Sequence, residues 1–266
     1  MKSVLLTMVQ CRSILGRITE NLSTIEQFVA ENQDSDVICF PEMCLTGYTS
    51  SNPIEYSITP DHPAIDVMVD MAKRYSISIV FGYIEQGSYG LHLRQEIVTP
   101  SGCRHVYRKT HLGIKESKLF VPGDSLPVFD LDGLVVGLHL CSESHIPEIS
   151  TTFRAKGAEL ILVPFANAIS GDRRRDTWHR YLPARANDNG VYVAACSAVG
   201  DNGAGVTFGG GLMVINPRGE IIRESYTDVE CSISVEIGGS LPRDGPQTMR
   251  NISYFDRRRP ELYSLK

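Results

Sequence analysis

The sequence predicts an α/β protein in which buried strands alternate with amphipathic helices in two successive halves of the chain. Two observations carry this prediction: short apolar runs rich in β-branched residues, and stretches between them whose apolar residues recur at helical spacing. A third observation refines it, because hairpin-like segments follow the alternation in each half. The pattern therefore indicates a mixed sheet or two sheets, and it argues against a simple doubly wound sheet.

The first half begins with an apolar strand followed by two helix–strand units. We expect strands at 4–9, 37–40 and 77–83, and helices at 19–32 and 61–75. The helix at 19–32 has Leu22, Ile25 and Phe28 on one face. Two short strands, at 96–98 and 105–107, flank Pro100-Ser101-Gly102, which predicts a turn between antiparallel neighbours.

The second half repeats this alternation. We expect strands at 135–140, 160–163, 191–198, 212–215, 220–223 and 233–235, and helices at 147–157 and 178–189. Pro183 should start or kink the second of these helices. Asn216-Pro217-Arg218-Gly219 has the composition of a hairpin turn, and Gly209-Gly210-Gly211 precedes a strand, where it would relieve crowding.

Composition limits the classes of function. The 266 residues fit one large domain or two small ones, and a formal charge of −5 argues against nucleic-acid binding. No apolar stretch approaches the ~20 residues of a membrane span, and we expect no signal peptide because the apolar run at the N-terminus is short and no small-residue cleavage site follows it. Seven cysteines without a C-x-x-C pair are typical of reduced thiols in a cytoplasmic protein, with neither disulfides nor a zinc site.

The segment 133–148 (GLVVGLHLCSESHIPE) joins a buried strand to a helix. Ser144 is a plausible N-cap and Pro147 occupies an early helical position, where its missing N–H is tolerated. A cysteine at such a turn, Cys141, points its sulfur out of the sheet beside free backbone N–H groups. This is a suitable place for a nucleophile with an oxyanion hole.

Polar residues also end two other predicted strands, where sites form in α/β sheets. These residues are Glu42 and Lys109. A carboxylate can take the proton of a thiol, and an ammonium group can stabilise both a thiolate and a developing oxyanion. Together with Cys141, they supply the roles needed for acyl transfer from an amide, which needs neither a metal nor a cofactor.

Four segments, in order and at the right spacing, resemble motifs of the nitrilase superfamily, the carbon–nitrogen hydrolases. They are Phe40-Pro41-Glu42 with Leu45-Thr46-Gly47-Tyr48, Arg108-Lys109-Thr110-His111-Leu112, Phe120-Val121-Pro122-Gly123-Asp124, and Cys141 with Pro147-Glu148. Gly157-Ala158 through Pro164 and the segment 258–263 extend the resemblance to nearly the whole chain.

The resemblance implies that Glu42 is the general base, Lys109 the stabiliser of the oxyanion and Cys141 the nucleophile that forms a thioester. The backbone N–H of Ser142 would supply a second oxyanion donor, and Glu116 would position the substrate or relay a proton. The family fold is a four-layer α-β-β-α sandwich, so residues 1–266 would form a single domain. Its members form homodimers or larger assemblies, with the tail from about residue 238 at the dimer interface.

Further residues near these motifs are candidates for substrate binding. They are Tyr48, Glu143, His145, Asn167 and Trp178, with Tyr48, Phe165, Asn167 and Trp178 expected on loops after strands. The family usually has aspartate at the position of Glu143 and an arginine-aromatic pair at His145-Ile146, so these differences bear on the substrate. The cluster Arg173–Arg175 could hold a substrate carboxylate.

Several functions remain open at this point. A linear amidase ranks first, an N-carbamoyl amidohydrolase second and a nitrilase third; a non-catalytic binding protein is a different class. A Cys-His hydrolase of another fold, with His145 or His111 as base, is a further alternative, whereas His139 alternates with leucines and is expected in the core. The expected partner is a small amide or carbamoyl compound.

Overall fold

The computed structural model describes residues 2–238 and 254–263. Its first sheet has six strands in the order β14-β1-β2-β3-β4-β5. These strands are β1 (Val4–Gln10), β2 (Val37–Cys39), β3 (Ser78–Gly87), β4 (Gly90–Val98), β5 (Arg104–Arg108) and β14 (Cys231–Ile237). Strands β1, β2 and β3 are parallel, while β4, β5 and β14 join them in antiparallel pairs. The carboxyl ends of β2 and β5 carry the Glu42 and Lys109 segments.

The second sheet also has six strands, in the order β13-β12-β9-β8-β7-β6. They are β6 (Phe129–Leu131), β7 (Leu134–Leu138), β8 (Leu160–Phe165), β9 (Tyr192–Ser197), β12 (Leu212–Ile215) and β13 (Ile221–Ser225). The central strands β7, β8 and β9 are parallel, so the segments after them meet at one edge. A small antiparallel pair, β10 (Val199–Asp201) and β11 (Thr207–Gly209), was not predicted.

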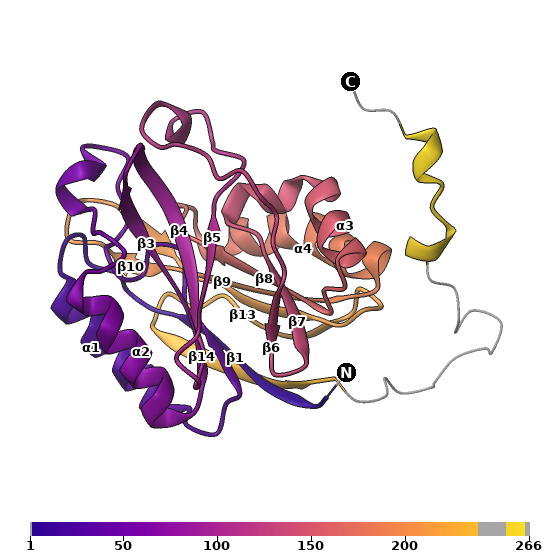
Figure 1. Ribbon diagram of the computed structural model, residues 1–266, viewed down its shortest axis with the longest axis horizontal. Coiled ribbons are helices and arrows are strands. Elements are labelled where there is room, and N and C mark those ends of the chain that lie inside the picture. Colours follow the sequence, from indigo (N-terminus) through magenta and orange to yellow (C-terminus); the bar gives the residue numbers. More distant parts are fainter. Residues whose placement is uncertain (1, 239–253, 264–266) are drawn as a thin grey trace.

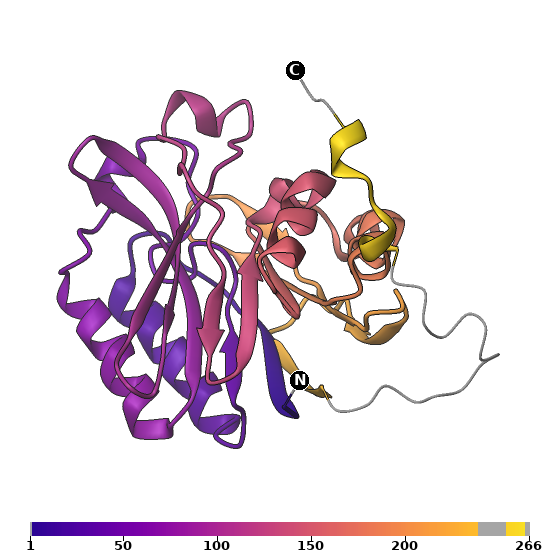
Figure 2. The same cartoon turned by 45° about the vertical axis from the view of Figure 1, so that its right-hand side comes forward.

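Four long helices cover the outer faces of the two sheets (Figures 1 and 2). They are α1 (Ile18–Glu31) and α2 (Pro63–Tyr75) on the first sheet, and α3 (Pro147–Ala155) and α4 (Gly171–Asn189) on the second. Strand alternation explains the layers: Leu6 and Met8 pack against the other sheet, whereas Val9 packs with residues of α1 and α2. The predicted four-layer α-β-β-α sandwich is confirmed.

Some element boundaries differ from the predictions. Helix α4 begins at Gly171 rather than at 178, because the side chain of Ser170 accepts a hydrogen bond from the Arg173 N–H and caps the helix there. Pro183 therefore lies inside the helix. Strands β3 and β4 form one long hairpin across Gly87 and Gly90, so the predicted short strand at 96–98 is only the end of β4.

The glycine triplet before β12 does relieve crowding, as predicted. A Cβ atom built on Gly211 would lie 2.3 Å from Cδ of Arg174, and Gly210 has a φ angle of +68°. Only glycine fits such positions without displacing neighbours.

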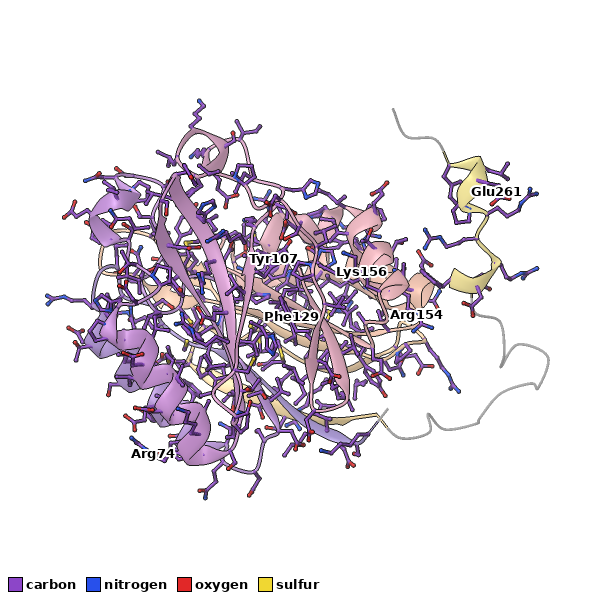
Figure 3. The ribbon with its side chains drawn as sticks, viewed as in Figure 1. Arg74, Tyr107, Phe129, Arg154, Lys156 and Glu261 are labelled. Atoms are coloured by element: carbon purple, nitrogen blue, oxygen red, sulfur yellow. The ribbon has the colours of Figure 1, made fainter. Side chains whose placement is uncertain are left out.

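The C-terminal tail from about residue 238 was expected at a dimer interface. Residues 239–253 and 264–266 lie outside the described part of the chain, whereas 254–263 contains two short 3-10 turns, η4 (Phe255–Arg257) and η5 (Pro260–Leu262). Arg154, on α3, is labelled in Figure 3. Its guanidinium carbon lies over the ring of Phe255, 5.5 Å from the ring centre. Among the described residues, no helix is long and apolar enough to cross a membrane.

Candidate active site

The three predicted catalytic residues follow three strand ends. Glu42 comes after β2, Lys109 directly after β5, and Cys141 begins the 3-10 turn η3 (Cys141–His145) after β7. The backbone N–H of Lys109 donates to the Leu93 carbonyl at 2.9 Å, which extends the ladder with β4 and fixes the direction of the lysine side chain. Residues from both sheets thus meet at one place.

Lys109 holds two carboxylates in the interior. Its Nζ lies 3.0 Å from Oε1 of Glu42 and 2.9 Å from Oε1 of Glu116. The side chains of Lys109 and Glu42 are only 1% and 2% exposed, and that of Glu116 is 16% exposed. The other oxygen of Glu116 accepts the Gly113 N–H at 2.7 Å, which orients its carboxylate toward the lysine.

The balance of charge sets the protonation of this cluster. Burial raises the pKa of Glu42, Lys109 opposes the rise and Glu116 adds to it, with the result that the pKa of Glu42 is about 7. Burial alone would lower the pKa of Lys109, but Glu42, Cys141 and Glu116 outweigh it, and that pKa is raised. Near neutral pH the lysine is therefore charged, and Glu42 is able to exchange a proton.

Cys141 is half-buried and its backbone is in the left-handed region, with φ of +51°. Burial and the charge of Glu42 raise the pKa of its thiol to about 12, while Lys109 and Arg174 act in the opposite direction. A thiol with this pKa is neutral at physiological pH, so it needs a base to become a nucleophile. Met43, the residue after Glu42, also has a positive φ, of +54°.

Glu143 was expected to contact substrate, but the structure places it in the interior between the cysteine turn and the lysine segment. Its carboxylate accepts from the Leu140 N–H at 2.8 Å, from the Thr110 N–H at 2.8 Å and from the Tyr107 hydroxyl at 2.8 Å. The carboxylate is fully buried. These bonds tie Cys141 to Lys109 through the backbone, which is a positioning role.

A second set of bonds fixes the turn from the side of α4. Arg185 donates to the carbonyl oxygens of Ser144 at 3.0 Å and of His145 at 3.1 Å. The hydroxyl of Ser144 donates to the Cys141 carbonyl at 2.6 Å instead of capping α3, whose N-cap is Ile146, so the predicted N-cap is wrong.

Ser142 is exposed near the start of the turn, where the first N–H groups have no partner within the turn. This leaves its N–H available as the predicted oxyanion donor.

The histidines near the cysteine have other contacts. The ring of His145 lies 4.1 Å from that of Tyr181, and its pKa is lowered by burial and by Arg185. His139 is in the core, as predicted, where its Nε2 pairs with the Ser150 hydroxyl at 2.9 Å. His111 pairs with the Thr110 hydroxyl at 2.8 Å. Each ring has a partner other than the thiol.

The predicted pocket residues separate into two groups. Tyr48 is half-buried near the site. Burial raises the pKa of its hydroxyl, and the nearby charges of Glu42, Glu116 and Cys141 add to the rise. Trp178, by contrast, lies in α4 and not on a loop, and it is fully buried with its ring 4.8 Å from that of Phe165. It therefore packs in the core.

The arginine cluster separates in the same way. Arg173 and Arg175 are exposed on α4, and Arg174 between them is fully buried, where it bonds to Asn167. Sequence reasoning treated the three arginines alike and missed Arg185 and Tyr107. The helical phase of α4 would have separated the arginines, had its start been placed at Ser170.

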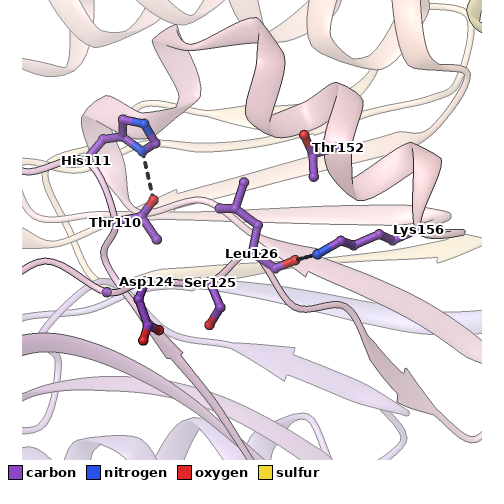
Figure 4. Close-up of a pocket in the computed structure, with 8 residues that line it drawn as sticks. Thr110, His111, Asp124, Ser125, Leu126, Thr152 and Lys156 are labelled. Carbon is purple, nitrogen blue, oxygen red and sulfur yellow. Dashed lines mark hydrogen bonds between the residues drawn. The ribbon is translucent and has the colours of Figure 1, made fainter. Parts of the chain in front are cut away.

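A separate hollow of about 560 Å³ lies beyond the lysine segment (Figure 4). It lies between the chain at 123–126 and helix α3, where Lys156 donates to the Leu126 carbonyl at 2.6 Å. None of Glu42, Lys109 and Cys141 lines it. Within the described ranges, no group of three or more His, Cys, Asp or Glu side chains is placed to hold a metal ion.

Comparison with known proteins agrees with this arrangement. The profile of the carbon–nitrogen hydrolase family matches residues 5–238. A hydrolase from Pseudomonas protegens is 30% identical and covers 98% of this chain and 91% of its own. An (R)-stereoselective amidase from a Pseudomonas species is 28% identical over 80% of this chain and 77% of its own, and an omega-amidase from Homo sapiens is 26% identical over 93% and 92%.

Solved structures give the same result. A mutant amidase from a Nesterenkonia species in complex with butyramide has a TM-score of 0.83 at 26% identity, covering 97% of this chain and 95% of that one. In another mutant of that amidase, also with a TM-score of 0.83 and at 25% identity, the acetamide moiety of fluoroacetamide is bound covalently to the active-site cysteine. With this fold and this match, the chain belongs to the carbon–nitrogen hydrolase family of the nitrilase superfamily and is a hydrolase of carbon–nitrogen bonds.

Proposed function

We propose that this hydrolase cleaves a small linear amide through a thioester on Cys141, with Glu42 as the general base. The observation that carries the proposal is the buried cluster in which the single positive charge of Lys109 faces the two carboxylates of Glu42 and Glu116. This leaves Glu42 with a pKa of about 7 near a thiol that cannot ionise unaided at neutral pH.

In the first half of the reaction, Glu42 takes the proton of the Cys141 thiol and the sulfur attacks the amide carbon. The resulting oxyanion is stabilised by the ammonium group of Lys109 and by the N–H of Ser142. Glu42 then gives its proton to the nitrogen, the carbon–nitrogen bond breaks, and ammonia or an amine leaves. The acyl group remains on the sulfur.

In the second half, Glu42 takes a proton from a water molecule, which attacks the thioester through a second oxyanion at the same donors. The carbon–sulfur bond breaks, the sulfur recovers the proton, and the carboxylic acid leaves. Glu116 supports both halves by holding Lys109 in place at 2.9 Å. Every step uses side chains and water, so the chemistry needs no cofactor.

An N-carbamoyl compound would follow the same steps and is the second candidate substrate, with a nitrile third. The packing of the His145 ring against Tyr181 and the hydrogen bond of His111 to Thr110 favour Glu42 over a histidine base.

The test is ammonia release across small amides, N-carbamoyl amino acids, ureido amines and nitriles, with wild type and Cys141→Ala side by side. We expect turnover of one class by the wild type and at least ~10²-fold less by the variant, since a nucleophile is lost. An acyl adduct of the wild type, seen by mass spectrometry after rapid quenching, would identify the thioester. Equal turnover by both proteins would contradict the proposal.

We further propose a homodimer or a larger assembly in which the C-terminal segment reaches the partner, and a reducing, cytoplasmic environment. The contact of Phe255 with α3 supports a role of this segment at the α3 face, and the seven unpaired cysteines support the environment. A monomer in light scattering at micromolar concentration would contradict the assembly.

A further inference from the structure

Ser144 carries a buried hydroxyl group in the turn η3, three residues after the nucleophile. It is 1% exposed, and its hydroxyl donates to the carbonyl oxygen of Cys141 at 2.6 Å. The hydroxyl does not cap α3, whose N-cap is Ile146. None of the proposed reaction steps uses this short, buried hydrogen bond, although it ends on the nucleophilic residue itself.

The bond holds a peptide group that the reaction uses from its other side. The carbonyl of Cys141 and the N–H of Ser142 belong to one planar trans peptide group, in which they point in opposite directions. A hydroxyl that fixes the carbonyl therefore also fixes the N–H, which points away from Ser144. This N–H is the proposed second donor to the oxyanion, so the bond from Ser144 determines the direction of that donor.

The peptide group before Cys141 is held as well. The N–H of Glu143 donates to the carbonyl oxygen of Leu140 at 3.1 Å. With both flanking peptide groups held, Cys141 stays in the left-handed region, with φ of +51°. This conformation is unfavourable for a residue other than glycine and persists only where its surroundings enforce it. Loss of the Ser144 hydroxyl would free the peptide group after Cys141, and with it the N–H of Ser142.

Helix α4 holds Ser144 in place. Arg185 donates to the carbonyl oxygens of Ser144 at 3.0 Å and of His145 at 3.1 Å. One turn earlier on the same helix, Tyr181 places its hydroxyl oxygen 3.4 Å from that of Ser144 and its ring centre 4.1 Å from that of His145. Contacts therefore restrain both the backbone and the hydroxyl of Ser144, which keeps the hydroxyl directed at Cys141.

We infer that Ser144 is a positioning residue of the oxyanion site, whose hydroxyl orients the N–H of Ser142 while Arg185 orients Ser144. A hydrogen bond to the carbonyl of a peptide group also polarises the N–H of that group, which makes it a stronger donor. The inference rests on the proposed function, in which the Ser142 N–H stabilises the oxyanion. It adds the residue that sets the geometry of this donor.

A purely structural role is the alternative, because serine hydroxyls in helical turns often donate to a carbonyl three residues earlier. The experiment therefore compares two reactions of Cys141 that share the thiol and its base. The first is turnover of the amide that the wild type hydrolyses fastest. The second is inactivation by methyl methanethiosulfonate: the thiolate attacks sulfur, a mixed disulfide forms and methanesulfinate leaves, so no oxyanion arises. Peptide mapping separates Cys141 from the exposed Cys103, which also reacts.

Ser144→Ala should lower kcat by about 10-fold, which is part of the effect of removing a whole oxyanion donor. KM and the rate of inactivation should stay within about twofold of wild type, because only the transition state is affected. Since both halves of the reaction pass through an oxyanion at the same donors, kcat falls whichever half is slower. Ser144→Thr keeps a hydroxyl and should restore most of kcat.

Two further variants complete the comparison. Arg185→Met removes the bonds that hold the Ser144 backbone and should give the same split between kcat and inactivation, by a smaller factor. Ser150→Ala is the matched control, because it removes another buried hydroxyl, paired with Nε2 of His139 at 2.9 Å. It should lower the melting temperature as Ser144→Ala does, and leave kcat unchanged. Circular dichroism checks folding, and Ser144→Ala tests the inference even if Arg185→Met does not fold.

Two results would overturn the inference and leave the proposed function intact. One is an unchanged kcat in Ser144→Ala, and the other is a fall in kcat matched by an equal fall in the rate of inactivation, which would give Ser144 a structural role alone. Failure of the wild type on every amide would instead count against both the proposed function and the inference.

Discussion

Two clusters of buried charges lie along the first sheet, and they differ in the ratio of cations to carboxylates. On β3 and β4, Glu85 and Glu96 are shared among three arginines. Arg94 bonds to both carboxylates, at 3.2 and 2.8 Å, while Arg108 donates two hydrogen bonds to Glu85 and Arg104 pairs with Glu96. At the strand ends, Glu42 and Glu116 share a single lysine. The carboxylates of both clusters are largely buried, but only in the second cluster do carboxylates outnumber cations.

The difference appears in the protonation of the carboxylates. Burial would raise the pKa of Glu85, but its bonds to Arg108 and the charge of Arg94 outweigh that effect, and the pKa is lowered. Glu42 shares its one lysine with Glu116, and its pKa is instead about 7. The number of cations therefore decides whether a buried carboxylate is a permanent charge or a proton acceptor.

The largest effect is expected in the arginine cluster. Arg94→Met removes the cation between two buried carboxylates, so we expect a loss of about 3 kcal/mol in the free energy of unfolding. The turnover number should stay within a few-fold of wild type, because this cluster takes no part in proton transfer. Urea denaturation and steady-state kinetics measure the two quantities. A stable but inactive variant would show that the two clusters are not separate in function.

The second prediction is the reverse, a loss of activity without a loss of stability. Glu42→Gln keeps the shape but removes the base, so kcat should fall by at least ~10²-fold, which corresponds to about 2.7 kcal/mol. Stability at pH 8 should not fall, because the variant no longer buries a charge that is only partly neutralised. The same kinetics and denaturation apply. A fall in kcat of only a few-fold would favour a histidine as base.

The smallest expected effect tests the ratio of cations to carboxylates in the cluster around Lys109. In the wild type, kcat/KM should rise with pH through about 7, because Glu42 accepts a proton only when it is ionised. Glu116→Gln removes a charge that raises the pKa of Glu42, so the rise should move to lower pH, by up to about one unit. A pH profile of kcat/KM for both proteins measures it. A move to higher pH would refute the role given to Glu116.

The sequence predicted most of the fold because its signals are local. Apolar runs and helical spacing located the strands and helices, and the motifs placed Glu42, Lys109 and Cys141 at strand ends, as the structure has them. The start of α4 was missed because a single serine, Ser170, decides it.

The partners of buried polar groups could not be predicted, since they depend on contacts across the sandwich. Glu143 looked like a substrate ligand, yet its acceptors are occupied by donors that lie more than thirty residues earlier, at Tyr107 and Thr110. The burial of Arg174 likewise depends on which face of α4 points into the core, and its hydrogen bond depends on Asn167 lying beside it.

The backbone at the site has a consequence for protein engineering. Among the described residues, five other than glycine have a positive φ; Asn52, Ser76 and Asp132 are of types suited to turns and caps, but Met43 and Cys141 are not. When its backbone is in the left-handed region, a residue other than glycine has a conformational energy roughly 1–2 kcal/mol less favourable than that of glycine. A selection for thermostability alone should therefore accept glycine at position 141, and it would discard the nucleophile in doing so.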